Sequence, residues 1–514
     1  MKKEKISAFE PATIILGIIL AVLSAIICMQ IIGKMGVTPN TSIIGAIVAL
    51  VLARIPLGNL KNFRNLERQN YIQTIVSGAG FSAANCAFLG LGIFYVMKEK
   101  NVMMPMAIGI CLGVIVSIYI VGKLFDSTLF PAQGAWPPGV ATANTLQAGD
   151  EGGDKGKRLI QGIIVGAIGS YFKLPAAGIG IVFIANIFSM TALGIGLIIR
   201  GYAPQFLSID LGQTYIPHGI MIGAGLMALI QSIKTITSKD ESKTKDLKVT
   251  VNSDQTRKAL IQSIVIYLVT AVIIAIITGV VSRMSMGKLI LWVVWATFSA
   301  FVAMLLVGQA AMHSGWFPAF AITTIFMTIG IFLGFDIVSI AVLTGFVSAV
   351  GPCFADMGYD LKTGWIIRGE SEDVASELYG RRQQVLIETV GGIIGVIVVV
   401  LSMNMYFEQD LMPPVSKVFA TTIGASVDTA MIKELLIWSV PGIIIQLVGG
   451  SSKMLGVLFA TGLLINNPIY GIGLIIAVII RMIFGTEFME VRDAGLIAGD
   501  GLFGFFAALI QTIF

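Results

Sequence analysis

The stretch ATIILGIILAVLSAIICMQII (residues 12–32) carries no charged residue and is long enough to cross a bilayer as one helix. Neither this stretch nor the other apolar runs of the chain show the alternation of apolar and polar residues that membrane-spanning strands need. The sequence therefore predicts an all-α polytopic membrane protein. Comparable apolar runs recur at 103–122, 176–199, 258–281, 286–307, 385–404 and 494–514.

The composition supports this class. Hydrophobic residues make up 56% of the 514 residues and charged residues only 12%, whereas soluble proteins carry about 25% charge. The N-terminal MKKEK precedes an apolar run that is too long for a signal peptide and is followed by no small-residue cleavage site, so 12–32 is expected to be the first spanning helix. The net charge of +5 is typical of basic cytoplasmic loops and does not indicate nucleic-acid binding. We expect a multi-pass protein of the plasma (inner) membrane.

One polar segment divides the chain. TSKDESKTKDLKVTVNSDQTR (237–257) is predicted to be a cytoplasmic linker between membrane halves 1–236 and 258–514. The halves share short matches in the same order: GIMIGAGL (219–226) recurs as GLIAGDGL (495–502), 276 positions later. Such matches predict an internal duplication, which is common in transporters.

We predict about sixteen helices, eight in each half. A cytoplasmic linker requires one more crossing in the first half than a simple count gives. The segment 70–97 supplies it if GAGFSAAN (78–85) breaks it into two short helices. The alternative is that 129–149, with three prolines and several glycines, dips into the membrane.

Polar residues inside apolar sequence are costly and often mark substrate pathways. Gln69 and Gln73 lie one turn apart on one helix face, and Asn85 follows them. Asn144 lies in the proline-rich segment 130–153, where irregular backbone is expected. The alternatives are ordinary helix caps for the first group and close packing of small residues for the second.

Two acids lie within apolar runs. Asp500 stands between two glycines in the final run and is a candidate for proton coupling. Glu388 lies about one turn into 385–404 and is a second candidate. Its alternative is an ion pair with Arg381 or Arg382.

The stretch GPCFADMGYDLKTGW (351–365) places Asp356, Tyr359, Asp360 and Lys362 close together between two apolar runs. Its Gly-Pro pair predicts a helix break. The block is either a plain polar loop or part of a site.

Other classes of site are absent from the sequence. There is no Walker A loop, so this chain does not use ATP, and there is no HExxH zinc motif. Two histidines and four scattered cysteines do not make a familiar site for a bare transition metal. We expect no cofactor.

Five segments stand out together: LERQNYIQTIVSGAG (66–80), FPAQGAWPPGVATANTL (130–146), YIPHGIMIGAGL (215–226), the region 356–392 and AGLIAGDGLFGF (494–505). Together they resemble the signature regions of the oligopeptide transporter (OPT) family, closest to its yellow stripe-like branch and bacterial relatives. The resemblance implies proton-coupled import of small oligopeptides or peptide-like metal chelates, about sixteen helices, a proton gradient as the energy source, and a possible homodimer.

Our hypothesis places the substrate near the midplane between the halves. Its ligands are predicted to be Gln69, Gln73, Asn85, Asn144, Tyr359 and Lys362. The predicted proton carriers are Asp356, Asp360, Glu388 and Asp500. The alternatives are a transporter of another solute, such as an amino acid or organic acid, a passive channel, and a membrane-embedded enzyme.

Overall fold

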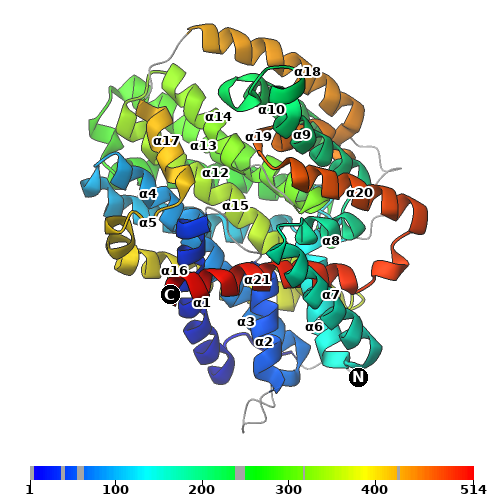
Figure 1. Cartoon of the computed structure of the whole chain (residues 1–514). Helices are drawn as coiled ribbons and strands as arrows, with labels where there is room; N and C mark the ends of the chain where they lie inside the picture. The colour runs from blue at the N-terminus through cyan, green and yellow to red at the C-terminus, as the bar shows by residue number, and fades with distance from the viewer. Residues whose placement is uncertain are drawn as a thin grey trace.

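The computed structural model describes residues 5–35, 41–54, 63–237, 249–315, 319–424 and 429–513. In these ranges the regular secondary structure is helical, and Figure 1 shows the helices packed around the long α15. The α-helices are α1 (Pro11–Met35), α2 (Thr41–Arg54), α3 (Leu66–Phe81), α4 (Leu89–Val96), α5 (Lys100–Leu124), α6 (Pro137–Glu151), α7 (Gly153–Tyr171), α8 (Ala176–Ile184), α9 (Ile187–Phe206), α10 (Ile216–Thr237), α12 (Ser253–Ile277), α13 (Met286–Ser314), α14 (Ala319–Phe332), α15 (Ile337–Ile367), α16 (Val374–Glu408), α17 (Pro414–Gly424), α18 (Thr429–Lys453), α19 (Leu455–Leu464), α20 (Pro468–Phe484) and α21 (Arg492–Ile513). The short segments are the π-helix η2 (Ser82–Phe88) and the 3₁₀ helices η3 (Leu211–Gln213), η4 (Val280–Ser282) and η5 (Glu487–Met489).

Many of these helices suit a bilayer. Among the described residues, nine helices are long and apolar enough to cross a membrane, and five more are apolar but shorter. This confirms a helical, multi-pass membrane protein. The count of sixteen and the division into two halves stay predictions, and residues 238–248 of the predicted linker lie outside the described ranges.

The predicted break at 78–85 is wrong. The chain stays helical from Leu66 to Val96, and η2 provides a π-helical stretch in place of a break. The small residues here serve close packing: a Cβ at Gly80 would lie 2.5 Å from Ser24 Oγ. π-helical turns inside α-helices often accompany functional sites.

The predicted helix break at 351–365 is also wrong, and so is the alternative that this block is a plain polar loop. The whole block lies within α15, a continuous helix of 31 residues, and is almost completely buried. Pro352 removes one backbone donor but does not end the helix. Inside a membrane the backbone must satisfy its own hydrogen bonds, which favours a helix even through polar sequence.

The proline-rich segment combines irregular backbone with a short helix. Residues 125–136 precede α6, and Trp136 has a left-handed φ of 39° and is fully buried. α6 then packs closely against α15, since a Cβ at Gly139 would lie 2.5 Å from the carbonyl oxygen of Tyr359. The irregular backbone expected here therefore lies buried in protein.

Two helix contacts repeat the same glycine pattern. Where α7 crosses α21, a side chain at Gly166 would meet the Leu496 carbonyl oxygen, and one at Gly499 would meet the Ile163 carbonyl oxygen. Figure 1 shows both helix pairs, α7 with α21 and α10 with α18.

The α10–α18 contact has the same pairs, shifted by 276 positions. A side chain at Gly442 would meet the Ile220 carbonyl oxygen, and one at Gly223 would meet the Ser439 carbonyl oxygen. The resemblance between GIMIGAGL and GLIAGDGL therefore reflects equivalent backbone-to-backbone packing.

Candidate functional site

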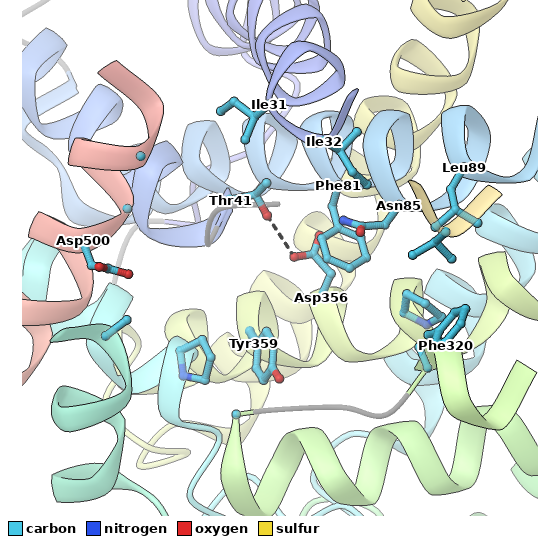
Figure 2. A pocket seen from close by; sticks show the side chains of 18 of the residues that line it. Ile31, Ile32, Thr41, Phe81, Asn85, Leu89, Phe320, Asp356, Tyr359 and Asp500 are labelled. Carbon is cyan, nitrogen blue, oxygen red and sulfur yellow. Dashed lines mark hydrogen bonds between the residues drawn. The ribbon is translucent and has the colours of Figure 1, made fainter. Parts of the chain in front are cut away.

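A cavity of about 660 Å³ lies between helices from distant parts of the chain. Figure 2 shows Asp500 at one side of it, Phe320 at the other, and Asp356 and Tyr359 between them. We call it the main cavity. Its lining residues come chiefly from α1, α2, α3, η2, α4, α8, α14, α15, α17 and α21.

α15 presents one face to the main cavity. Ser348, Pro352, Asp356 and Tyr359 all line it, and their spacing of three or four residues puts them on one stripe of the helix. The polar residues of the 351–365 block are thus arranged by helical periodicity, which a loop would not provide.

The α3–η2 segment supplies a related stripe. Phe81, Asn85 and Leu89 line the same cavity at four-residue spacing. The sequences SGAGFSAAN (77–85) and SAVGPCFAD (348–356) match at their serine, third-following glycine and penultimate alanine, and this alignment pairs Asn85 with Asp356. This likeness could have indicated that Asn85 and Asp356 occupy equivalent positions, but the sequence analysis did not use it.

Asp356 is held by hydroxyl groups. Thr41 Oγ1 donates to its Oδ1 over 3.2 Å, as drawn in Figure 2, and Ser77 Oγ lies 3.2 Å from the same oxygen. The side chain is buried but borders the main cavity, where a ligand could reach it.

Asp360 lies one turn further along α15 and is fully buried. Its Oδ1 accepts hydrogen bonds from Ser42 Oγ at 2.7 Å and Gln73 Nε2 at 2.6 Å, while its Oδ2 has no hydrogen-bond partner in the described chain. Gln73, predicted to bind substrate, therefore contacts an acid behind the cavity. Asn70 extends this network through a 3.0 Å bond to Gln73.

Glu388 on α16 completes the acidic group. The alternative that it pairs with Arg381 or Arg382 is wrong, because Arg381 pairs with Glu377 and Arg382 is exposed. One carboxylate oxygen each of Asp356, Asp360 and Glu388 lies within 4.8 Å of the others. We call these three residues the carboxyl triad. Sequence analysis named all three members but not that they meet.

A separate ion cluster lies close by. Arg368 pairs with Glu377 at 2.7 Å, and Arg381 lies 3.2 Å from Glu377 and 3.6 Å from Asp126. All four side chains are buried, and two positive charges balance two negative ones. Sequence analysis missed this cluster, because Asp126 is far from the other three along the chain.

Gln384 joins the ion cluster to α15. Its Oε1 accepts from Arg368 at 2.9 Å, and its Nε2 donates to the Asp360 carbonyl oxygen at 2.7 Å.

The sequence analysis also missed the hydroxyl residues Thr41, Ser42 and Ser77. Single serines and threonines are common in apolar helices, and these three show no particular spacing.

Asp500 approaches the main cavity from α21 and is not part of the triad. Gly501 and Gly504 also line the cavity, and a Cβ at either would meet nothing within 4 Å. The glycines beside this acid therefore border open space, unlike Gly499.

Asn144 and Lys362 lie elsewhere. They line a second cavity of about 530 Å³, together with Gln147, Glu370 and Glu372. Lys362 Nζ donates to the Ala132 carbonyl oxygen at 2.7 Å and lies over the Trp365 ring.

Gln69 borders neither cavity. Its Nε2 donates to the Arg64 carbonyl oxygen at 3.3 Å, near the start of α3. Of the six predicted substrate ligands, the structure brings Asn85 and Tyr359 to the main cavity, and Asn144 and Lys362 to the second.

Comparison with known protein families identifies the family of this chain. The model of the family described as "OPT oligopeptide transporter protein" matches residues 11–200 and 212–511. No curated protein matches the chain. The family is one of transporters, so the membrane-embedded enzyme considered above is set aside. The chain therefore belongs to the OPT oligopeptide transporter family and is a multi-pass membrane protein that transports rather than catalyses.

Proposed function

We propose that this protein is a secondary active transporter that imports small oligopeptides or peptide-like metal chelates, driven by a proton gradient. The observation that carries the proposal is the main cavity, about 660 Å³ in volume, with Asp356 and Asp500 on its wall. This volume is within the usual range for small-molecule sites.

The cavity wall suits a peptide. Asp356 and Asp500 match the ammonium end, since a carboxylate and an ammonium form strong charge-assisted hydrogen bonds. Tyr359, whose hydroxyl has no hydrogen-bond partner in the described chain, and Asn85 offer contacts for the peptide backbone. Most of the remaining wall is apolar, as expected for varied side chains.

Asp500 is the proposed acid for proton coupling. It borders the cavity, and we propose that a proton and a substrate both reach it from there. Asp356, Asp360 and Glu388 stay candidates for the same role. Comparing Asp500→Asn with Glu388→Gln separates the two assignments.

The second cavity extends the proposed path. α15 borders the main cavity at Tyr359 and the second cavity at Lys362, less than one turn apart. Between them, Gly139 of α6 packs on this turn, and Thr363 Oγ1 donates to the Gly139 carbonyl oxygen at 3.0 Å. We propose that this contact opens during transport, and that Lys362 and Asn144 then meet the carboxylate end of the substrate.

Proteoliposome uptake tests the proposal. A labelled tetrapeptide should accumulate above its external concentration when the proton gradient is imposed, and tri- to pentapeptides should compete with it. Chromatography should recover the internal peptide intact. Failure to concentrate the peptide would favour a channel, and competition by amino acids or organic acids alone would favour the other-solute alternative.

Three finer predictions accompany this proposal. They are membership of the yellow stripe-like branch, residence in the plasma (inner) membrane, and assembly as a homodimer. Uptake of a peptide-like metal chelate in the same vesicles tests the first, and cell fractionation and mass determination in detergent test the others.

A further inference from the structure

The carboxyl triad is concentrated negative charge in an apolar interior. Asp356 and Asp360 come from one face of α15, and Glu388 reaches them from α16. All three side chains are at most 3% exposed. Burying three carboxylates this close together is very costly unless positive charge accompanies them.

Glu388 gives a second, independent observation. Both of its carboxylate oxygens are buried and have no hydrogen-bond partner in the described part of the chain. Helix α3 is shaped to admit this side chain, because a Cβ at Gly78 would lie 2.6 Å from Glu388 Cγ. The side chain is therefore accommodated by packing, yet its oxygens are left open toward the two aspartates.

The basic side chains described nearby contact partners other than the triad. Arg381 is bound to Glu377, and Lys362 donates to a backbone carbonyl at the second cavity. The hydrogen bonds that the triad accepts from side chains come from hydroxyl groups and one amide, which carry no charge. The positive charge that balances the triad therefore comes from outside these side chains, as bound protons or as a bound cation.

We propose that the carboxyl triad binds one hard divalent cation, of the Mg²⁺, Ca²⁺ or Mn²⁺ class. All its ligand atoms are carboxylate oxygens, the donors that such ions prefer, and the group contains neither His nor Cys. A divalent ion balances two of the three charges, whereas a monovalent ion balances only one. The hydroxyls of Thr41, Ser42 and Ser77 orient two of the carboxylates, as outer partners do at metal sites.

The ion has a route to this site. Asp356 and Thr41 both line the main cavity, whereas Asp360 and Glu388 lie behind them. A bound ion would join α15 to α16 at the wall of the cavity. This inference goes beyond the proposed transport, because it assigns a bound cation to the triad whichever acid carries the coupled proton. Asp500, the acid proposed first for that role, lies outside the triad.

Direct binding of Mn²⁺ tests the proposal. Purified full-length protein is titrated with MnCl₂ in detergent, and free Mn²⁺ is followed by electron paramagnetic resonance. We expect saturable binding of one Mn²⁺ per chain, displaced by Ca²⁺ or Mg²⁺ but not by the same concentration of Na⁺. Glu388→Gln should weaken binding by about tenfold or more, because affinity depends on ligand charge.

Glu408→Gln is the matched control, since it makes the same change on the same helix at an exposed site and should leave binding unchanged. Glu388→Gln removes an unpaired buried charge without changing shape, so folding should be retained, and Asp360→Asn should reproduce its effect. No saturable binding by the wild type, or equal binding by the wild type and Glu388→Gln, would overturn the proposal. Because this assay uses neither peptide nor gradient, its failure is distinct from failure of the proposed transport.

Discussion

The α7–α21 and α10–α18 contacts use equivalent glycines but differ in the residue that follows one of them. Gly166 and Gly442 each let a helix approach the backbone of its partner, at positions 276 apart. One residue after the equivalent glycines Gly223 and Gly499, however, stand Ala224 and Asp500. Ala224 is fully buried, whereas Asp500 borders the main cavity. The shared glycines therefore allow close helix packing, and the acid that only one contact carries lies at the wall of the main cavity.

Placing the acid in the other contact gives the largest expected effect on stability. Ala224→Asp puts an unpaired carboxylate where Ala224 has no exposure and packs near Gly456. An uncompensated buried charge costs about 3–5 kcal/mol. We expect little folded protein, measured as the monodisperse fraction in size-exclusion chromatography. Ala224→Val is the uncharged control for size. A wild-type yield of Ala224→Asp would contradict the claim that position 224 is more buried than position 500.

Filling the shared glycines should give a smaller and matched loss. A methyl group at Gly166 or Gly442 meets a carbonyl oxygen of the partner helix, and such overpacking costs about 1–3 kcal/mol. Thermal unfolding in detergent should show that Gly166→Ala and Gly442→Ala lower the midpoint by similar amounts. A loss at one site alone would break the equivalence of the two contacts.

The next glycine along should respond in the opposite direction. A Cβ at Gly501 meets nothing within 4 Å, while one at Gly225 would lie 3.2 Å from Leu306 Cδ1. Alanine favours a helix over glycine by up to about 1 kcal/mol. Gly501→Ala should therefore raise the unfolding midpoint more than Gly225→Ala does. A lower midpoint for Gly501→Ala would mean that this part of α21 is packed rather than open.

Removing the acid should change stability least of all. Asp500→Ala makes α21 resemble α10 at this position, and changes away from tight packing stay within about 0.5 kcal/mol. The unfolding midpoint should stay close to that of the wild type. A loss as large as that of Gly166→Ala would assign Asp500 a structural role instead.

The sequence predicted the class of fold correctly but not where the helices continue or break. Length and apolarity of the runs were sufficient for a helical membrane protein, because the bilayer imposes both. The predictions for 78–85 and 351–365 are wrong, because glycine and proline often interrupt helices and charged residues are rare inside membrane-spanning ones. In this interior, Gly80 gives room to a neighbouring side chain and the acids of α15 find hydroxyl partners.

The candidate site was predicted in its members but not in its arrangement. Asp356 and Asp360 share a helix face by their spacing, but nothing in the sequence places Glu388 beside them. Gln69 was predicted from its position one turn from Gln73, and Lys362 from its place in the 351–365 block, but their partners are backbone carbonyls away from the main cavity. Contacts between distant segments, such as Ser42 with Asp360, arise only from tertiary packing.

Peptide-dependent proton entry tests the central claim most directly. Proteoliposomes containing a pH-sensitive dye are given a tetrapeptide outside, and the internal pH is followed for the wild type and Asp500→Asn. The account predicts that the peptide acidifies wild-type vesicles and that Asp500→Asn vesicles, with equal amounts of folded protein, do not acidify. Peptide accumulation without acidification, or equal acidification by Asp500→Asn, would contradict it.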